Sequence, residues 1–117
     1  MTSIKDIAWL AGLLEGEGSF SVGVVRKGRQ TGKRRLQITL MMTDEDVVRR
    51  ASAIMKTKLY GPYGPYKNCT KACWQIHVGA SKAAAWMMTL YSFMGERRRL
   101  AIEQGLREWQ TFRAAST

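Results

Sequence analysis

Residues 10–20 read LAGLLEGEGSF, and this stretch decides how the chain folds. Apolar residues before and within it recur at helical spacing, at Ile7, Leu10, Leu13 and Leu14. The pattern predicts a helix over residues 4–14 that Gly16 and Gly18 bring to an end. Residues 19–25 then alternate between apolar residues and small or polar ones, which predicts a half-buried strand. The stretch should therefore lead a helix directly into a strand.

A second strand is expected over residues 35–42, where the apolar residues are Leu36, Ile38, Leu40 and Met42. The polar segment RKGRQTGKRR at residues 26–35 contains two glycines and suits the turn of a hairpin between the two strands. Acidic residues at 44–46 favour the start of a helix running to about Lys56, because they complement the positive end of its dipole.

The second half of the chain is expected to form another hairpin followed by two helices. Residues 60–66 read YGPYGPY and permit only an edge strand, since proline cannot donate to a ladder. Residues 73–78 alternate and should pair with them as a second hairpin. Ser81 is expected to cap a third helix, and Gly95 to separate it from a last one. The order αββαββαα predicts a single α+β domain over residues 1–117, with a four-stranded antiparallel sheet, helices on one face and a polar face left open.

Charge narrows the choice of partner. The chain has 117 residues and carries 19 Lys and Arg against 9 Asp and Glu, a net charge of +10. So large an excess on a small domain indicates a polyanionic partner, with nucleic acid foremost. Neither a membrane-spanning run nor a secretory signal is recognisable, so we expect a cytoplasmic protein whose two cysteines are reduced.

The stretch at residues 10–20 resembles the LAGLIDADG motif of homing endonucleases, with Glu15 and Glu17 at the positions of its two aspartates. The Leu-Ala-Gly-Leu opening and the closing glycine, Gly18, are both present, and the order of elements after the motif is also similar. The resemblance implies a LAGLIDADG-like fold. It also implies a site-specific endonuclease of a mobile element that makes double-strand breaks with 3′ overhangs.

The same resemblance assigns roles to individual residues. It implies that Glu17 is the metal ligand and that the backbone carbonyl of Gly16 adds a second one. It also implies a basic residue beside the scissile phosphate, for which Arg97 is the best aligned of the three adjacent arginines Arg97, Arg98 and Arg99. Carboxylates suit Mg²⁺, the expected ion, although other divalent cations are also candidates. Glutamate in place of aspartate lengthens the side chain by one methylene, which keeps open a non-cleaving DNA- or RNA-binding protein, either maturase-like or regulatory.

A single copy of the motif implies a homodimer. Ala8, Gly12 and Gly16 form a stripe of small residues on which a second helix could approach closely. The expected interface comprises Ala8, Ala11, Gly12, Glu15 and Gly16. The alternative is that this stripe packs against the chain's own sheet.

The open sheet face is the expected contact with double-stranded DNA, in the major groove. Its outward residues are predicted to be Ser19, Ser21, Gly23, Val25, Lys27, Arg35, Gln37, Thr39, Met41, Cys73, Gln75 and His77. The basic residues of the loop between the two strands should contact phosphates, and they include Lys27, Arg29, Lys33 and Arg34. No membrane and no small-molecule substrate is expected as a partner.

Two further hypotheses are weaker. Cys69, Cys73 and His77 recur every four residues, but the strand pattern and the lack of a fourth soft ligand argue against zinc. The third hypothesis for the function of the chain is a basic component of a ribonucleoprotein whose similarity to the motif is due to chance.

Overall fold

The computed structural model describes residues 2–24, 28–29, 32, 34–65 and 70–116, and it confirms the predicted element order. A short 3₁₀ helix, η1 (Tyr91–Phe93), precedes the last helix. The other elements are α1 (Ile4–Glu17), β1 (Gly18–Val24), β2 (Arg34–Met42), α2 (Glu45–Met55), β3 (Tyr60–Tyr63), β4 (Cys73–Gly79), α3 (Ala80–Leu90) and α4 (Glu96–Ser116). No helix among the described residues is long and apolar enough to cross a membrane.

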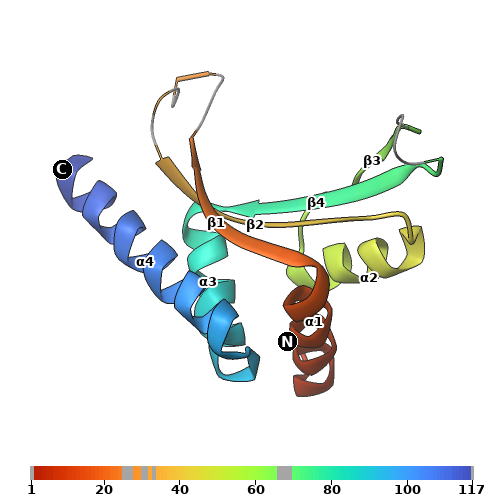
Figure 1. Ribbon diagram of the computed structural model, residues 1–117, viewed down its shortest axis with the longest axis horizontal. Coiled ribbons are helices and arrows are strands. Elements are labelled where there is room, and N and C mark those ends of the chain that lie inside the picture. The colour runs from red at the N-terminus through yellow and green to blue at the C-terminus, as the bar shows by residue number, and fades with distance from the viewer. Residues whose placement is uncertain (1, 25–27, 30–31, 33, 66–69, 117) are drawn as a thin grey trace.

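The four strands form one antiparallel sheet in the order β1-β2-β4-β3. All the helices lie against one face of this sheet, and the opposite face is left uncovered (Figure 1). The predicted α+β architecture is therefore confirmed. Strand β1 forms one edge, so the end of α1, which leads into β1, lies at that edge of the sheet.

The core lies between the sheet and the helices. Phe20 of β1, Ile38 of β2 and Val78 of β4 stand opposite one another across three strands, and all three are buried. The period-2 apolar pattern that predicted the strands thus forms the inner face of the sheet. Buried residues from the helices complete the core, notably Leu10, Leu14, Met87, Leu90 and Ile102.

The junction between α1 and β1 explains the glycine that closes the motif. The N–H of Gly18 donates to the carbonyl of Leu14 and ends the helix. A Cβ at Gly18 would lie 2.7 Å from Leu14 Cδ2 and 2.9 Å from the Leu14 carbonyl oxygen, so a larger residue does not fit. Helix α1 continues past Gly16 to Glu17, further than predicted, because a helix tolerates an exposed glycine at a cost of only about 1 kcal/mol.

Two local predictions were wrong. Ser81 is not a cap, because β4 runs on to Gly79, which is itself the N-cap of α3. Cys73 is buried, at 8% exposed, and does not belong to the open face. The strand alternation is regular only from Ile76 onward, since the pairing of β3 with β4 is irregular between Tyr60 and Tyr63.

Candidate nucleic-acid interface

Polar residues form rows across the open face of the sheet. Ser19, Thr39 and His77 stand opposite one another on β1, β2 and β4. The next row contains Ser21 and Gln37 and ends at Gly79. Met41, which is 48% exposed, and Gln75 form a third row that reaches β3. The described residues predicted to point outward therefore do share one face, apart from Cys73.

Two glycines make room for the two longest polar side chains of this face. The amide of Gln37 lies over β1, where Nε2 donates to Ser21 Oγ at 3.3 Å. A Cβ at Gly23 would lie 2.8 Å from that Nε2. On the other side, a Cβ at Gly79 would collide with the guanidinium of Arg35. Both side chains thus occupy space that only glycine leaves free.

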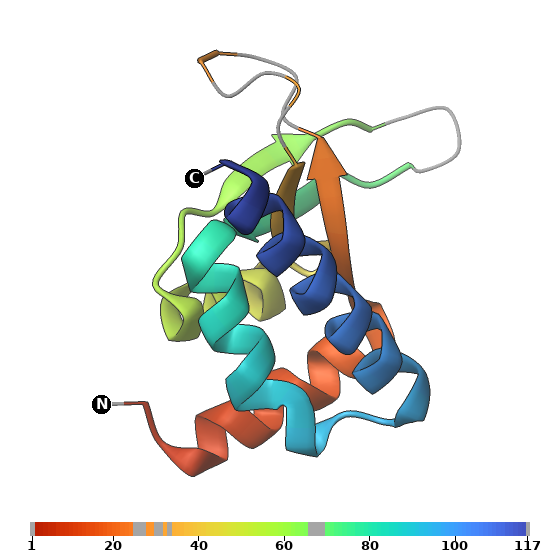
Figure 2. The ribbon, with the colours of Figure 1, turned by 90° about the vertical axis from the view of Figure 1, so that its left-hand side faces the viewer.

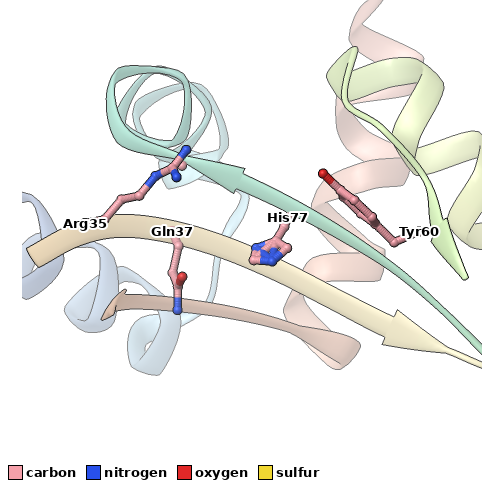
Figure 3. Close-up of a pocket in the computed structure, with 5 residues that line it drawn as sticks. Arg35, Gln37, Tyr60 and His77 are labelled. Carbon is pink, nitrogen blue, oxygen red and sulfur yellow. The ribbon is translucent and has the colours of Figure 1, made fainter. Parts of the chain in front are cut away.

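A shallow pocket of about 180 Å³ lies on this face and is lined by Arg35, Gln37, Tyr60, His77 and Gly79 (Figure 3). Its side chains come from three strands. The rings of Tyr60 and His77 meet edge to face, with centroids 6.2 Å apart. The pocket offers both hydrogen-bond donors and acceptors, with only donors on Arg35, and such a mixture suits the edge of a base.

Sequence reasoning missed Tyr60. The segment YGPYGPY was expected to give an edge strand at best, and no residue of it was assigned to the site. The register of β3 against β4 brings Tyr60 opposite Gln75 and beside the pocket. The only signal in the sequence was that Tyr60 is an aromatic residue at the start of an expected edge strand. The periodicity of the sequence does not show which residues of the neighbouring strand lie opposite it.

The surroundings of His77 favour the neutral form of its imidazole. Partial burial and the nearby positive charge of Arg35 both lower the pKa of its imidazole below the ordinary value of 6.5. A neutral imidazole has one N–H donor and one acceptor nitrogen. The neutral form of His77 can therefore both donate a hydrogen bond to a ligand and accept one from it, as the hydroxyl of Tyr60 also can.

The predicted phosphate contacts in the loop are only partly described. Val25, Lys27 and Lys33 lie outside the described residues. Arg29 is exposed. Arg34 is also exposed, but its guanidinium lies 4.8 Å from the ring centroid of Phe112 in α4, so it points to the helix side of the sheet. For Cys69 of the zinc hypothesis, too, no structure is described.

Glu17 lies at the C-terminal end of α1, at the edge of the sheet, and is exposed. No hydrogen bond or ion pair within the described part of the chain engages its carboxylate. Gly16 precedes it in the last turn, where carbonyls lack partners inside the helix. These oxygens are the hard donors that Mg²⁺ prefers, and they fit such an ion chemically.

One chain alone supplies an incomplete metal site. Mg²⁺ takes about six oxygen ligands, and the described residues contain no group of three or more His, Cys, Asp or Glu side chains that could hold an ion. The remaining ligands would have to come from water, from a phosphate or from a second copy of the chain.

Glu15, in contrast, is engaged within its own chain. Its Oε1 accepts a hydrogen bond of 2.6 Å from the backbone N–H of Gly95, and Arg98 Nε donates to its backbone carbonyl at 3.1 Å. The end of α1 is thereby tied to the start of α4. Arg97, the predicted basic residue, is exposed next to this contact.

The stripe of small residues on α1 faces away from the chain's own sheet. Ala8, Gly12 and Gly16 are exposed, and a Cβ at either glycine would meet nothing within 4 Å. The alternative that this stripe packs within the chain is therefore wrong. Ala11 was wrongly placed in the interface, because the helical turn puts it in the core beside Leu10 and Leu14, where it is 2% exposed.

The chain has the fold of the LAGLIDADG homing endonucleases, and its size is consistent with the single-motif type. The homing endonuclease I-CvuI, solved with its DNA target in the presence of calcium, superposes with a TM-score of 0.75 at 13% identity, over 97% of this chain and 73% of that one. The group I intron-encoded I-CeuI, complexed with DNA, gives 0.69 at 14% identity, over 97% and 58%. The meganuclease I-CpaMI, bound to uncleaved DNA, gives 0.68 at 11% identity, over 94% and 39%.

No protein family model matches the sequence, and no curated protein matches it either. The likeness thus lies in the fold and in the motif, not in overall sequence.

Proposed function

We propose that this chain is a site-specific DNA endonuclease that acts as a homodimer and hydrolyses phosphodiester bonds with a divalent cation. One observation carries the proposal: the exposed carboxylate of Glu17, which has no hydrogen bond or ion pair among the described residues, ends the motif helix at the edge of a polar open sheet. This arrangement occurs in a fold whose solved relatives include complexes with DNA.

The open face is the DNA-binding surface. Arg35 and Gln37 carry the side chains suited to reading guanine and adenine, and Met41 can contact a thymine methyl group. The net charge of +10 supplies the attraction to phosphates that every duplex offers. Glu17 lies beside β1, so a duplex lying along the sheet passes close to its carboxylate.

The dimer forms through the exposed stripe of α1. Gly12 and Gly16 allow a second α1 backbone to approach closely, and Ile4, which is 69% exposed, adds an apolar contact near the start of the same helix. A two-fold axis along this stripe brings together two Glu17 side chains, one for each DNA strand.

Within each half of the dimer, Glu17 and the Gly16 carbonyl hold the cation, and Arg97 contacts the scissile phosphate. A bound cation neutralises the negative charge that grows on the phosphate oxygens during hydrolysis. Mg²⁺ is the proposed ion. The Glu17 side chain is one methylene longer than that of aspartate, and this length would set where its carboxylate holds the ion.

We also propose that the gene is part of a mobile element. The target is then the empty insertion site, which is obtained by joining the DNA sequences that flank the gene. A supercoiled plasmid carrying this insertion site should be linearised in Mg²⁺ by the wild-type protein. Glu17→Gln should bind the plasmid equally well and cut it at least roughly a hundredfold more slowly, because a metal ion contributes several kcal/mol to the transition state. Glu17→Asp keeps the charge and should retain cutting.

The presence of glutamate instead of aspartate favours one second candidate, a non-cleaving DNA- or RNA-binding protein. Tight binding of the insertion site with no cutting in Mg²⁺, Mn²⁺ or Ca²⁺ would support it. Cutting that persists at the wild-type rate in Glu17→Gln would reject the assigned site.

A further inference from the structure

Arg98 differs from its two neighbouring arginines. Arg97 and Arg99 are exposed, whereas the Arg98 side chain is 17% exposed and points at α1. Its Nε lies 3.1 Å from the backbone carbonyl of Glu15 and 3.5 Å from the Oε2 of the same residue. A single guanidinium therefore contacts both the main chain and the side chain of Glu15.

A second contact holds the same glutamate from the other side. The backbone N–H of Gly95 donates to Glu15 Oε1 at 2.6 Å. A Cβ at Gly95 would lie 2.5 Å from this oxygen, so the contact needs glycine at that position. Figure 2 shows the end of α1 beside the start of α4, where these contacts join them. We refer to Glu15, Gly95 and Arg98 together as the α1–α4 clamp.

The α1–α4 clamp reduces the repulsion between negative charges at the end of α1. The C-terminal end of a helix carries a partial negative charge, and Glu15 and Glu17 add two more negative charges there. No basic residue of α1 itself lies in its last turn. The guanidinium of Arg98 offsets this repulsion, and its contacts with Glu15 are charge-assisted, which makes them stronger than ordinary hydrogen bonds.

We propose that Arg98 is a positioning residue for the metal-binding acid. By occupying the Glu15 carbonyl and carboxylate, it fixes the last turn of α1 and leaves the Glu17 carboxylate and the Gly16 carbonyl for the cation. Arg98 is assigned a positioning role and not a phosphate contact, because its Nε is directed at Glu15. This inference rests on the function proposed above and adds to it the residue that sets the geometry of the site.

The test measures Mn²⁺ binding by electron paramagnetic resonance on the protein–DNA complex, together with the single-turnover cleavage rate. Arg98→Ala should weaken Mn²⁺ binding and slow cleavage by roughly 10- to 100-fold, as is usual when a group that orients a metal ligand is lost. The Kd for DNA should stay within about threefold, in contrast to a lost phosphate contact. Arg99→Ala removes the same charge from the same turn and should leave Mn²⁺ binding unchanged.

Two further variants distinguish a lost positioning role from a general loss of folding. Arg98→Lys keeps the charge and one donor and should restore part of the Mn²⁺ affinity, while Gly95→Ala breaks the other side of the clamp and should reproduce the Arg98→Ala effect. Equal Mn²⁺ affinity in Arg98→Ala and Arg99→Ala would overturn the positioning role. A wild-type complex that binds no Mn²⁺ and cuts no DNA would instead reject the proposed function itself.

Discussion

At the scale of single residues, glycines determine where the polar side chains of the open face lie. Gly79 leaves the space that the Arg35 guanidinium occupies, and Gly23 leaves the space for the amide of Gln37. In the DNA-binding function proposed above, the pocket of Arg35, Gln37, Tyr60 and His77 would contribute to discrimination between bases as well as to affinity.

Arg35 should contribute selectivity for a guanine at one position of the target. A bidentate arginine–guanine contact is worth about 1–3 kcal/mol against the wrong base, and lysine cannot reproduce its fork geometry. Arg35→Lys should therefore reduce discrimination at that position roughly 10- to 100-fold, measured by fluorescence anisotropy on duplexes that differ in one base pair. Gly79→Ala should have a similar effect, because its Cβ displaces the guanidinium. An unaltered preference in both variants would exclude Arg35 as a base-reading residue.

His77 should make stability depend on pH in a defined window. Burial and Arg35 lower the pKa of His77 in the folded chain, so the unfolded chain takes up the proton first as the pH falls through 6.5. The free energy of unfolding should decrease from there until the folded-state pKa is passed, and the His77 contribution should be constant above 6.5.

Urea unfolding at pH 7.5 and 5.5 measures this effect, with His77→Gln as the comparison. The variant should lose less stability than the wild type over this interval. An NMR titration of the imidazole should also show a higher pKa in Arg35→Gln, because one of the two causes of the shift is removed. A pKa at or above the ordinary value in the wild type would contradict the assigned surroundings.

How far the site could be predicted varied from residue to residue. The motif located Glu17 and Gly18 at a helix end followed by a strand, because these positions depend on local chain order, and the role of Glu17 stays a prediction. Tyr60 and Arg98 were not predicted, since their positions depend on strand register and on the packing of α4 against α1. Sequence periodicity carries no information about either.

At the scale of elements, α1 has two different faces. Leu10, Ala11 and Leu14 are buried in the core, while Ala8, Gly12 and Gly16 are exposed. An exposed helical glycine is unfavourable by about 1 kcal/mol relative to alanine, so two of them on one face need a reason beyond the single chain. The homodimer proposed above would provide that reason, because a second α1 would approach closely along this face.

Gly12→Leu should therefore separate the protomers without unfolding them. A Cβ at Gly12 would meet no atom of the described residues within 4 Å, so the circular dichroism spectrum should be unchanged, whereas the helices of two protomers could no longer approach closely. Sedimentation velocity should show a dimer for the wild type and a monomer for the variant at the same concentration. Ala53→Leu, at an exposed position of α2, is the matched control and should stay dimeric. A monomeric wild type, or a dimeric Gly12→Leu, would contradict the role of the stripe.

The elements themselves were largely predictable, because each pattern matched the period of its structure. Leu36, Ile38 and Leu40 alternate, and all three are buried. The ends of the elements were predicted less accurately. Helix α1 extends to Glu17, because its last hydrogen bonds form beyond the predicted end. Gly79, and not Ser81, is the N-cap of α3, because β4 continues to Gly79.

At the scale of the whole molecule, the fold and the charge support the same account. One face of the sheet is covered by helices, and the other is open and polar (Figure 1). The chain also carries a net charge of +10. In the homodimer proposed above, two such sheets related by a two-fold axis would together contact a long DNA site. Such symmetry imposes an inverted repeat on the target.

Selection of bound duplexes from a random library tests this central claim most directly. The wild-type protein should enrich one sequence made of two inverted half-sites, with two protein chains bound to each duplex by native mass spectrometry. Recovery of a single unrepeated half-site bound by one chain, or no enriched sequence at all, would contradict the account.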